Sequence, residues 1–297
     1  MDNIIYAVII SVIRGGFYSL MAVGLSLVFG VMNIANFAHG EFYMLGAYFA
    51  YCGSVVFRLN PFLSILFAGA AVFVIGVGVE KAVFVPLRVR SKKNWLMNTF
   101  LLTLGISIIM QNLVRVVVGN RNYGLRRGYF QGNMQIFGMG ISNDRIICFL
   151  ISMAAIVGLM LFLNRTRLGR AIRAVSQDAT GAQLVGINLG FIYSFTFGLS
   201  CALAAIAGAC LLFKDPATPI VGLAPLYKSW FVLILVGMGN VGASIIGGII
   251  VGFLETLAVD WLGSGWMDVM SLGIIMLMLI IKPNGLFGKK GVKSAVE

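Results

Sequence analysis

The chain has 297 residues, of which 60% are hydrophobic and only 11% are charged, and its formal net charge is +12. Soluble domains carry roughly 25% charged residues, so this composition excludes an ordinary soluble protein. Apolar runs of membrane length recur along the whole chain. Because they are continuous rather than alternating, they predict a polytopic all-α membrane protein and exclude a β-barrel. We expect residues 1–297 to form a single transmembrane domain.

Nine apolar segments are expected to be membrane helices: residues 4–31, 37–57, 62–84, 96–118, 146–163, 190–213, 228–240, 243–259 and 267–281. Two of them, 228–240 and 267–281, are short for a full crossing and could be re-entrant. The sequence therefore predicts about eight to ten crossings, with broken or re-entrant segments among them.

Clusters of cations give the expected orientation. With nine crossings, three basic segments fall on the same side, which the positive-inside rule makes the cytoplasm: Arg88, Arg90, Lys92 and Lys93; Arg165, Arg167, Arg170 and Arg173; Lys282, Lys289, Lys290 and Lys293. The amino terminus then lies outside, as does the loop 119–145 despite its four arginines. We interpret the positive charge as a signal of topology in a lipid bilayer, and we expect no nucleic-acid partner.

The first candidate site is the segment that follows residue 30. It places two asparagines, the only histidine and a carboxylate between two apolar runs: Asn33, Asn36, His39 and Glu41. A helix break there would have to be surrounded by protein or by a water-filled cavity. Gly30 and Asn33 recur as Gly237 and Asn240, and paired broken helices often mark a translocation path. We therefore take Asn33, Asn36, His39, Glu41 and Asn240 as candidates for that path.

His39 and Glu41 allow three interpretations. They could be metal ligands, a proton relay or a structural hydrogen-bonded pair, and the structural pair is favoured because one histidine cannot build a typical metal site. The four cysteines, Cys52, Cys148, Cys201 and Cys210, all lie in apolar spans without metal or disulfide spacing. They are expected to be small core residues.

Residues 164–188 form an amphipathic insert between two apolar spans. Apolar side chains recur there at helical spacing and predict one continuous stripe: Leu168, Ala171, Ile172, Val175, Ala179 and Ala182. Such a cytoplasmic helix could be a handle that another protein moves. The alternative is a basic helix that lies on the bilayer surface.

The nucleotide-binding motifs of soluble domains give no support for a cofactor. Gly237, Gly239 and Gly242 match the pattern G-x-G-x-x-G, but no hydrophilic βαβ unit surrounds them. No P-loop pattern occurs in the sequence, so ATP, if it drives this protein, would be used by a separate polypeptide. We expect the chain itself to hold no cofactor.

Ionisable residues within apolar spans distinguish the remaining classes of function. Arg14 and Arg115 lie in or near spans, and Glu255 and Asp260 lie near the end of another. An ion-coupled carrier or channel, which is the main alternative to an ATP-driven transporter, would be expected to place carboxylates centrally. A membrane-embedded enzyme is disfavoured because the sequence shows no carboxylate–histidine or cysteine–histidine constellation.

Four segments resemble the permease family of branched-chain amino acid ABC importers. They are GLSLVFGVMNIANFAHGEFYMLGAY (24–48), RLGRAIRAVSQDATGAQLVGIN (167–188), VGMGNVGASIIGGIIVGFLE (236–255) and IKPNGLFG (281–288). Together they sample the chain from end to end. Two departures are small: Thr180 stands where the family usually has an acidic residue, and Val236 stands where it usually has glycine.

The resemblance implies a non-enzymatic importer subunit in the bacterial cytoplasmic (inner) membrane. Its implied partners are two ATPase subunits, a second permease subunit that is a paralogue or a copy, and an external substrate-binding protein. Related permeases serve leucine-like, aromatic, other neutral or urea-like solutes. The resemblance also makes residues 164–188 the segment that couples to the ATPase, with these candidate residues: Arg167, Leu168, Arg170, Ile172, Val175, Ala182 and Gly186.

Overall fold

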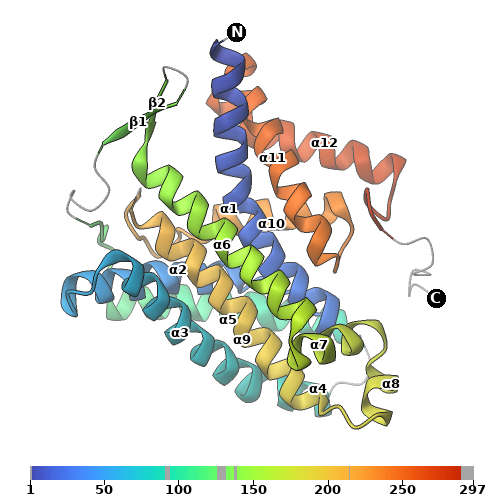
Figure 1. Ribbon diagram of the computed structural model, residues 1–297. Coiled ribbons are helices and arrows are strands. Elements are labelled where there is room, and N and C mark those ends of the chain that lie inside the picture. The colour runs from blue at the N-terminus through green and yellow to red at the C-terminus, as the bar shows by residue number, and fades with distance from the viewer. Residues whose placement is uncertain (1, 91–93, 126–131, 137–138, 214, 289–297) are drawn as a thin grey trace.

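A computed structural model describes residues 2–90, 94–125, 132–136, 139–213 and 215–288 (Figure 1). Long helices dominate the fold: α1 (Asp2–Met32), α2 (His39–Tyr51), α3 (Pro61–Val79), α4 (Val85–Arg90), α5 (Trp95–Val117), α6 (Asn143–Arg165), α7 (Arg167–Gln177), α8 (Ala179–Leu184), α9 (Leu189–Leu211), α10 (Leu223–Val236), α11 (Val241–Leu262) and α12 (Met267–Ile281). Two π-helical turns, Cys52–Val56 and Glu80–Phe84, extend α2 and α3, and a 3₁₀ turn, Ser264–Trp266, precedes α12. The strands β1 (Asn133–Ile136) and β2 (Met139–Ser142) form an antiparallel hairpin.

Every apolar segment expected to be a membrane helix is helical, but the number of full crossings is lower than expected. Within the described residues, seven helices are long and apolar enough to cross a membrane. The difference from eight to ten lies in α2, with 13 residues, and α10, with 14 residues. At a rise of 1.5 Å per residue, neither helix spans a hydrocarbon core of about 30 Å by itself.

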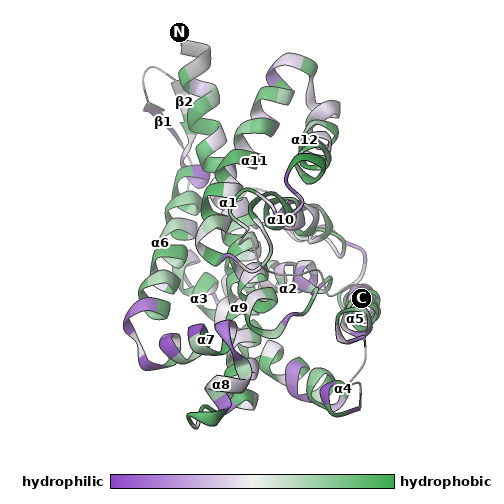
Figure 2. Ribbon diagram, turned by 90° about the vertical axis from the view of Figure 1, so that its right-hand side faces the viewer, coloured by the Kyte–Doolittle hydropathy of each residue, from purple (hydrophilic) through white to green (hydrophobic). Residues whose placement is uncertain are grey.

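The two ends of the molecule differ in composition. The amino terminus and the β hairpin lie at one end, and α4, α7 and α8 lie at the other (Figures 1 and 2). The basic segments of α4 and α7 therefore share one end, as the expected topology requires. Lys92, Lys93, Lys289, Lys290 and Lys293, which were part of that expectation, lie outside the described residues.

The interior of the helix bundle is built from α1 and α9. Most of the apolar window of α9 is buried, 72%, whereas only 17% of that of α5 is buried. The most extensive packing joins α1 to α11 and α9 to both α2 and α3. Consequently α5 and α12 lie at the periphery, where their apolar side chains are available to lipid or to another subunit.

The short helices α2 and α10 begin at the same point inside the molecule. A methyl group added to Gly222 would lie 1.9 Å from the carbonyl oxygen of Gly40, so the two helix starts can approach only because both positions are glycine. From there α2 runs to the aromatic contact between Tyr51 and Tyr123 in the loop near the hairpin. In contrast, α10 runs to Gly239, which packs on Gly30 near the far end of α1. The two helices thus lead from the middle of the bundle toward opposite ends.

Gly30 and Asn33 recur in the sequence as Gly237 and Asn240, but the structure does not place the two motifs at equivalent positions. The two glycine motifs meet directly, because a methyl group on Gly30 would lie 2.8 Å from the carbonyl oxygen of Gly239. By its place in the fold, Asn240 is equivalent to Asn60 and not to Asn33. Each asparagine caps the helix that follows a short helix, Asn60 through Leu63 N–H and Asn240 through Ala243 N–H.

The segment expected at 228–240 needs correction. Helix α10 begins at Leu223 and ends at Val236, because Gly237 has φ +101° and breaks the helix. A helix that began at residue 228 would have placed Lys228 at the outer boundary. Lys228 instead lies within α10 and is buried.

Candidate functional site

The chain breaks between α1 and α2, as the cluster of polar residues predicted. Helix α1 ends at Met32, and Asn33 adopts the left-handed conformation with φ +52°. Asparagine tolerates this conformation better than most residues. Residues 33–38 are not helical, so their backbone groups need partners from elsewhere in the protein.

A polar stripe on α5 supplies many of these partners. Trp95 Nε1 donates a hydrogen bond to the carbonyl oxygen of Met32 at 3.2 Å. The Thr103 hydroxyl donates to the carbonyl oxygen of Ala35 at 3.1 Å and accepts from Phe37 N–H at 3.1 Å. Sequence reasoning missed this role, although Thr99, Thr103, Ser107 and Gln111 recur every four residues and therefore lie on one face of the helix.

The stripe continues to Glu41, which is buried in the first turn of α2. Its Oε1 accepts hydrogen bonds from the Ser107 hydroxyl at 2.8 Å and from Gln111 Nε2 at 2.7 Å. Both donors bind the same oxygen of this carboxyl group, which is not hydrogen-bonded to His39 in the described structure. Glu41 joins α2 to α5.

His39 and Asn36 lie deeper and are fully buried. His39 Nε2 lies 3.2 Å from the carbonyl oxygen of Met21 in α1, and its Nδ1 has no partner within the described residues. Asn36 Oδ1 accepts from Ala38 N–H at 3.1 Å, while its Nδ2 has no partner among the described residues. Both side chains thus leave a donor or acceptor available inside the bundle at the point where α2 begins.

The five candidates for the path do not form one cluster. His39, Asn36 and Glu41 surround the helix break, whereas Asn33 and Asn240 are exposed. Asn33 ends α1, and Asn240 caps α11 beside the packed pair Gly30 and Gly239. Aromatic rings close the other side of the break: Phe37 stacks on Trp230 of α10, with ring centroids 4.9 Å apart.

The insert 164–188 folds into two helices rather than one continuous helix. Thr166 caps α7 by accepting from Gly169 N–H at 2.9 Å, and Asp178 caps α8 by accepting from Thr180 N–H at 2.9 Å. Asp178 has extended backbone angles, so it ends α7 and starts α8. The apolar spacing that predicted one stripe gave no sign of this break, but an aspartate followed by a short helical segment is a usual start signal.

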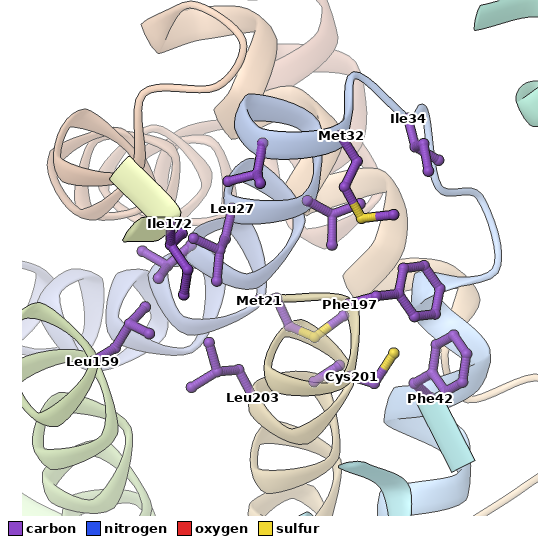
Figure 3. Packing of buried hydrophobic residues seen from close by; sticks show 14 of the residues in the cluster. Met21, Leu27, Met32, Ile34, Phe42, Leu159, Ile172, Phe197, Cys201 and Leu203 are labelled. Atoms are coloured by element: carbon purple, nitrogen blue, oxygen red, sulfur yellow. The ribbon is translucent and has the colours of Figure 1, made fainter. Parts of the chain in front are cut away.

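The apolar side of the segment 164–188 packs on its own chain. Ile172, Val175 and Ala182 are buried in the main core cluster together with residues of α1, α6 and α9. Figure 3 shows Ile172 beside Leu27 of α1, with Leu159 of α6 close by. A methyl group on Gly169 would lie 2.2 Å from the carbonyl oxygen of Phe162, so this glycine allows α7 to lie tightly on the end of α6.

The surface left for a partner consists of the polar side of α7 and the tip of α8. Arg167, Arg170 and Gly186 are exposed, and Leu168 is half-buried. Sequence reasoning missed Leu184 and Val185, which are 84% and 77% exposed. Two adjacent apolar side chains held out at a helix end, next to Gly186 with φ +87°, are typical of a contact surface.

Metal binding finds no support in the geometry of the described residues. No three histidine, cysteine, aspartate or glutamate side chains among them come close enough to hold a metal ion together. All four cysteines are unpaired, and three of them are buried.

Comparison with known proteins identifies the family. The model of the family described as "Branched-chain amino acid transport system / permease component" matches residues 7–281. The chain belongs to this family. It is therefore a multi-pass membrane protein and a permease subunit of a transport system.

Similar proteins cover nearly the whole chain. The permease BraD of Pseudomonas aeruginosa and the permease LivH of Escherichia coli K12, both named for high-affinity branched-chain amino acid transport systems, are each 30% identical to it, over 94% of both chains. The permease LivM of Escherichia coli K12 is 27% identical over 91% of this chain and 67% of its own length. No solved structure matches the chain.

Proposed function

We propose that the chain is the membrane-spanning subunit of an ATP-driven importer for branched-chain or other neutral amino acids, in the cytoplasmic membrane of a bacterium. The observation that carries this proposal is the family match over residues 7–281, supported by relatives named for branched-chain amino acid transport. The chain makes and breaks no bond in this scheme. ATP is bound and hydrolysed by partner subunits, so this chain needs no cofactor of its own.

The proposed assembly holds two ATPase subunits, a pair of permease subunits and an external substrate-binding protein. The similarity to both LivH and LivM supports a pair of paralogous permeases, since two permeases of one organism match the same chain. The apolar faces of α5 and α12, which cover little of the bundle core, offer surface for the second permease and for lipid.

Helix α1 connects the coupling segment to the helix break. Ile172 of α7 is buried beside Leu27, about a turn and a half before α1 ends at Met32 and the break begins. Because tightly packed cores deform little, a force on α7 would move the end of α1 rather than compress the contact. ATP-driven closure of the ATPase pair would thereby change residues 33–38 and open or close the path.

The ATPase would contact the exposed side of the coupling segment. Arg167 and Arg170 present positive charge there, and Leu184 and Val185 present apolar surface. Exposed apolar side chains surrounded by polar residues can form the centre of an interface, while the charges at the rim affect the rate of association. In this proposal Ile172, Val175 and Ala182 contribute by holding the segment on α1, α6 and α9.

The alternative of an ion-coupled carrier is disfavoured by the state of the carboxylates. Glu41 is held by two neutral donors, and Glu255 forms an ion pair with Lys228 in the interior. A carboxylate that carries protons or sodium ions must be free to exchange them. In this structure Glu41 instead joins α2 to α5, and Glu255 joins α11 to α10.

The experiment that tests ATPase coupling compares two substitutions in the coupling segment. Leu184→Asp should leave the permease folded but abolish co-purification with the ATPase and ATP-driven uptake, because it places a charge at the centre of the contact. Leu184→Met retains apolar surface and is the matched control. Ile172→Asp should instead prevent folding of the permease itself, since it buries an unpaired charge in the core. Normal complex formation by Leu184→Asp would contradict this assignment.

A further inference from the structure

A cavity of about 260 Å³ lies in the half of the bundle that contains the amino terminus. It is enclosed by α1, α2, α6, α9, α10 and the start of α12. Its wall includes Asp144 and Arg145 in the first turn of α6 and Met267 and Asp268 in the first turn of α12, at the end where the β hairpin also lies (Figure 1). Met21 and Tyr43 extend it to the region where α2 begins. The cavity thus lies between the outer end of the bundle and the helix break.

Charges of both signs line this cavity, although it lies among apolar helices. Arg14 has only a weak contact, from Nη1 to the sulfur of Met267 at 3.8 Å, and no carboxylate partner among the described residues. Arg145 also has no ion-pair partner in the part of the chain that the structure describes. An arginine within a membrane helix is costly unless it meets an anion or water, so Arg14 presents a site for a carboxylate.

The acidic side of the cavity is anchored by an ion cluster. Lys228 is buried and pairs with both Glu255 and Asp268, and the Tyr18 hydroxyl donates to Glu255 at 2.6 Å. Glu255 is fully buried, whereas the Asp268 side chain remains 75% exposed. Lys228 therefore neutralises Glu255 in the interior, and Asp268 still presents oxygen atoms to a second cation.

The rest of the wall is apolar. Phe17, Met21, Cys148 and Leu211 are among the residues that line it, together with Tyr43. A pocket of this size is below the 300–1,000 Å³ that is usual for drug-sized ligands, so it suits a smaller molecule. The combination of two arginines without an ion-pair partner among the described residues, the accessible carboxylate of Asp268 and an apolar remainder matches one chemical class of ligand: a zwitterionic amino acid with an apolar side chain.

We propose that this cavity is a binding subsite for a neutral α-amino acid inside the permease. The substrate carboxylate binds Arg14, its ammonium group binds Asp268, and its side chain lies against Phe17, Met21 and Leu211. This inference rests on the proposed function and adds to it, because it gives the permease its own selectivity for the zwitterion. An anionic solute would make no ionic contact with Asp268, and a cationic solute would leave Arg14 without a counter-charge.

The test measures binding without the external binding protein. The permease–ATPase complex is placed in lipid nanodiscs, and tritiated L-leucine is displaced by unlabelled L-leucine, by leucinamide, which lacks the carboxylate, or by 4-methylpentanoate, which lacks the ammonium group. We expect each analogue to compete at least about tenfold more weakly than leucine, because each loses one charge-assisted contact. Equal competition by either analogue, or no binding of leucine, would overturn the proposal.

Variants of the chain sharpen this result. Arg14→Gln and Asp268→Asn should each weaken leucine binding about tenfold or more. Arg14→Gln should also remove the preference for leucine over leucinamide, and Asp268→Asn the preference over 4-methylpentanoate. Arg121→Gln removes an exposed arginine from the loop on the same side of the bundle, outside the cavity, and should bind as the wild type does. Wild-type affinity in Arg14→Gln would contradict the assignment.

The same preparations distinguish this inference from the proposed function. ATP-driven leucine uptake by the wild type, measured with binding protein present, tests the importer. Uptake by the wild type together with unchanged binding in Arg14→Gln would overturn the subsite alone, whereas absence of ATP-driven uptake would overturn the importer. If Arg14→Gln does not fold, as judged by gel filtration and ATPase co-purification, the analogue series on the wild type still decides.

Discussion

Helices α2 and α10 begin side by side at Gly40 and Gly222, yet different chemistry holds them in place. The first turn of α2 carries Glu41, which neutral donors of α5 satisfy. Helix α10 carries Lys228, which pairs with acidic residues of α11 and α12. Each packs on two long helices: α2 lies on α9 and α3, and α10 lies on α1 and α11.

This difference indicates distinct tasks for the two helices. A buried ion pair is held strongly, because separating its charges in the membrane interior leaves both unpaired. Hydrogen bonds to a threonine, a serine and a glutamine are individually weaker and exchange more easily. We therefore interpret α10 as the fixed half-helix and the start of α2, with residues 33–38 before it, as the half that moves.

The largest effect is expected when the ion cluster at α10 is broken. Lys228→Met leaves Glu255 buried without a counter-charge and should lower the stability of the permease by about 3–5 kcal/mol. Thermal unfolding in detergent, followed by gel filtration, measures this loss. The double variant Lys228→Met/Glu255→Gln should recover much of it, since no buried charge remains. Equal stability of the single variant and the wild type would refute the fixed role of α10.

A smaller effect is expected where the two helices meet. Gly222→Ala brings a methyl group to 1.9 Å from the Gly40 carbonyl oxygen, so the helix starts must separate, at about 1–3 kcal/mol. Its φ of −78° suits alanine, so the penalty is steric. Gly105→Ala on α5 is the matched control, because nothing lies within 4 Å of that position and alanine favours a helix. Melting of both variants in detergent checks this difference, and similar melting temperatures would contradict the close contact.

The smallest effect on stability is expected at the hydrogen bonds that hold the break. Thr103→Val leaves the Ala35 carbonyl and the Phe37 N–H without their side-chain partner and should cost about 1–2 kcal/mol. Because residues 33–38 belong to the half that moves, amino acid uptake should fall more in this variant than in other variants of equal stability. Thr103→Ser keeps the hydroxyl and should behave as the wild type. A transport defect in both variants would show that the hydroxyl is not the relevant group.

The sequence predicted the positions of the helices well and their partners poorly. Hydropathy located α5 to within a residue or so at each end, because membrane spans are long apolar runs. Hydropathy could not pair Lys228 with Glu255, because these residues lie on different helices. It also placed Lys228 at the outer boundary, because the expected helix began at residue 228 and α10 begins at Leu223. The close approach of Gly222 to Gly40, where α10 begins, is a contact between distant segments that hydropathy does not report.

The candidate sites were also predicted by their position in the sequence but not by their contacts. The polar cluster after residue 30 correctly predicted a helix break, since hydrocarbon cannot satisfy such groups. The apolar stripe of the segment 164–188 was predicted from its helical period, but the period alone could not show that residues of the same chain cover Ile172. Leu184 and Val185 were missed because an exposed apolar pair has no periodic pattern. The polar residues of α5, in contrast, recur every four residues in the sequence and could have been predicted to share one face of the helix.

The central claim is that ATP hydrolysis by a partner drives this permease. The most direct measurement is uptake of labelled L-leucine by proteoliposomes that contain the permease pair and the ATPase subunits, with ATP inside and binding protein outside. Uptake should stop when ATP or the binding protein is removed, and an uncoupler should leave its initial rate nearly unchanged. Uptake by this polypeptide alone, driven by an imposed proton or sodium gradient without ATP, would contradict the account.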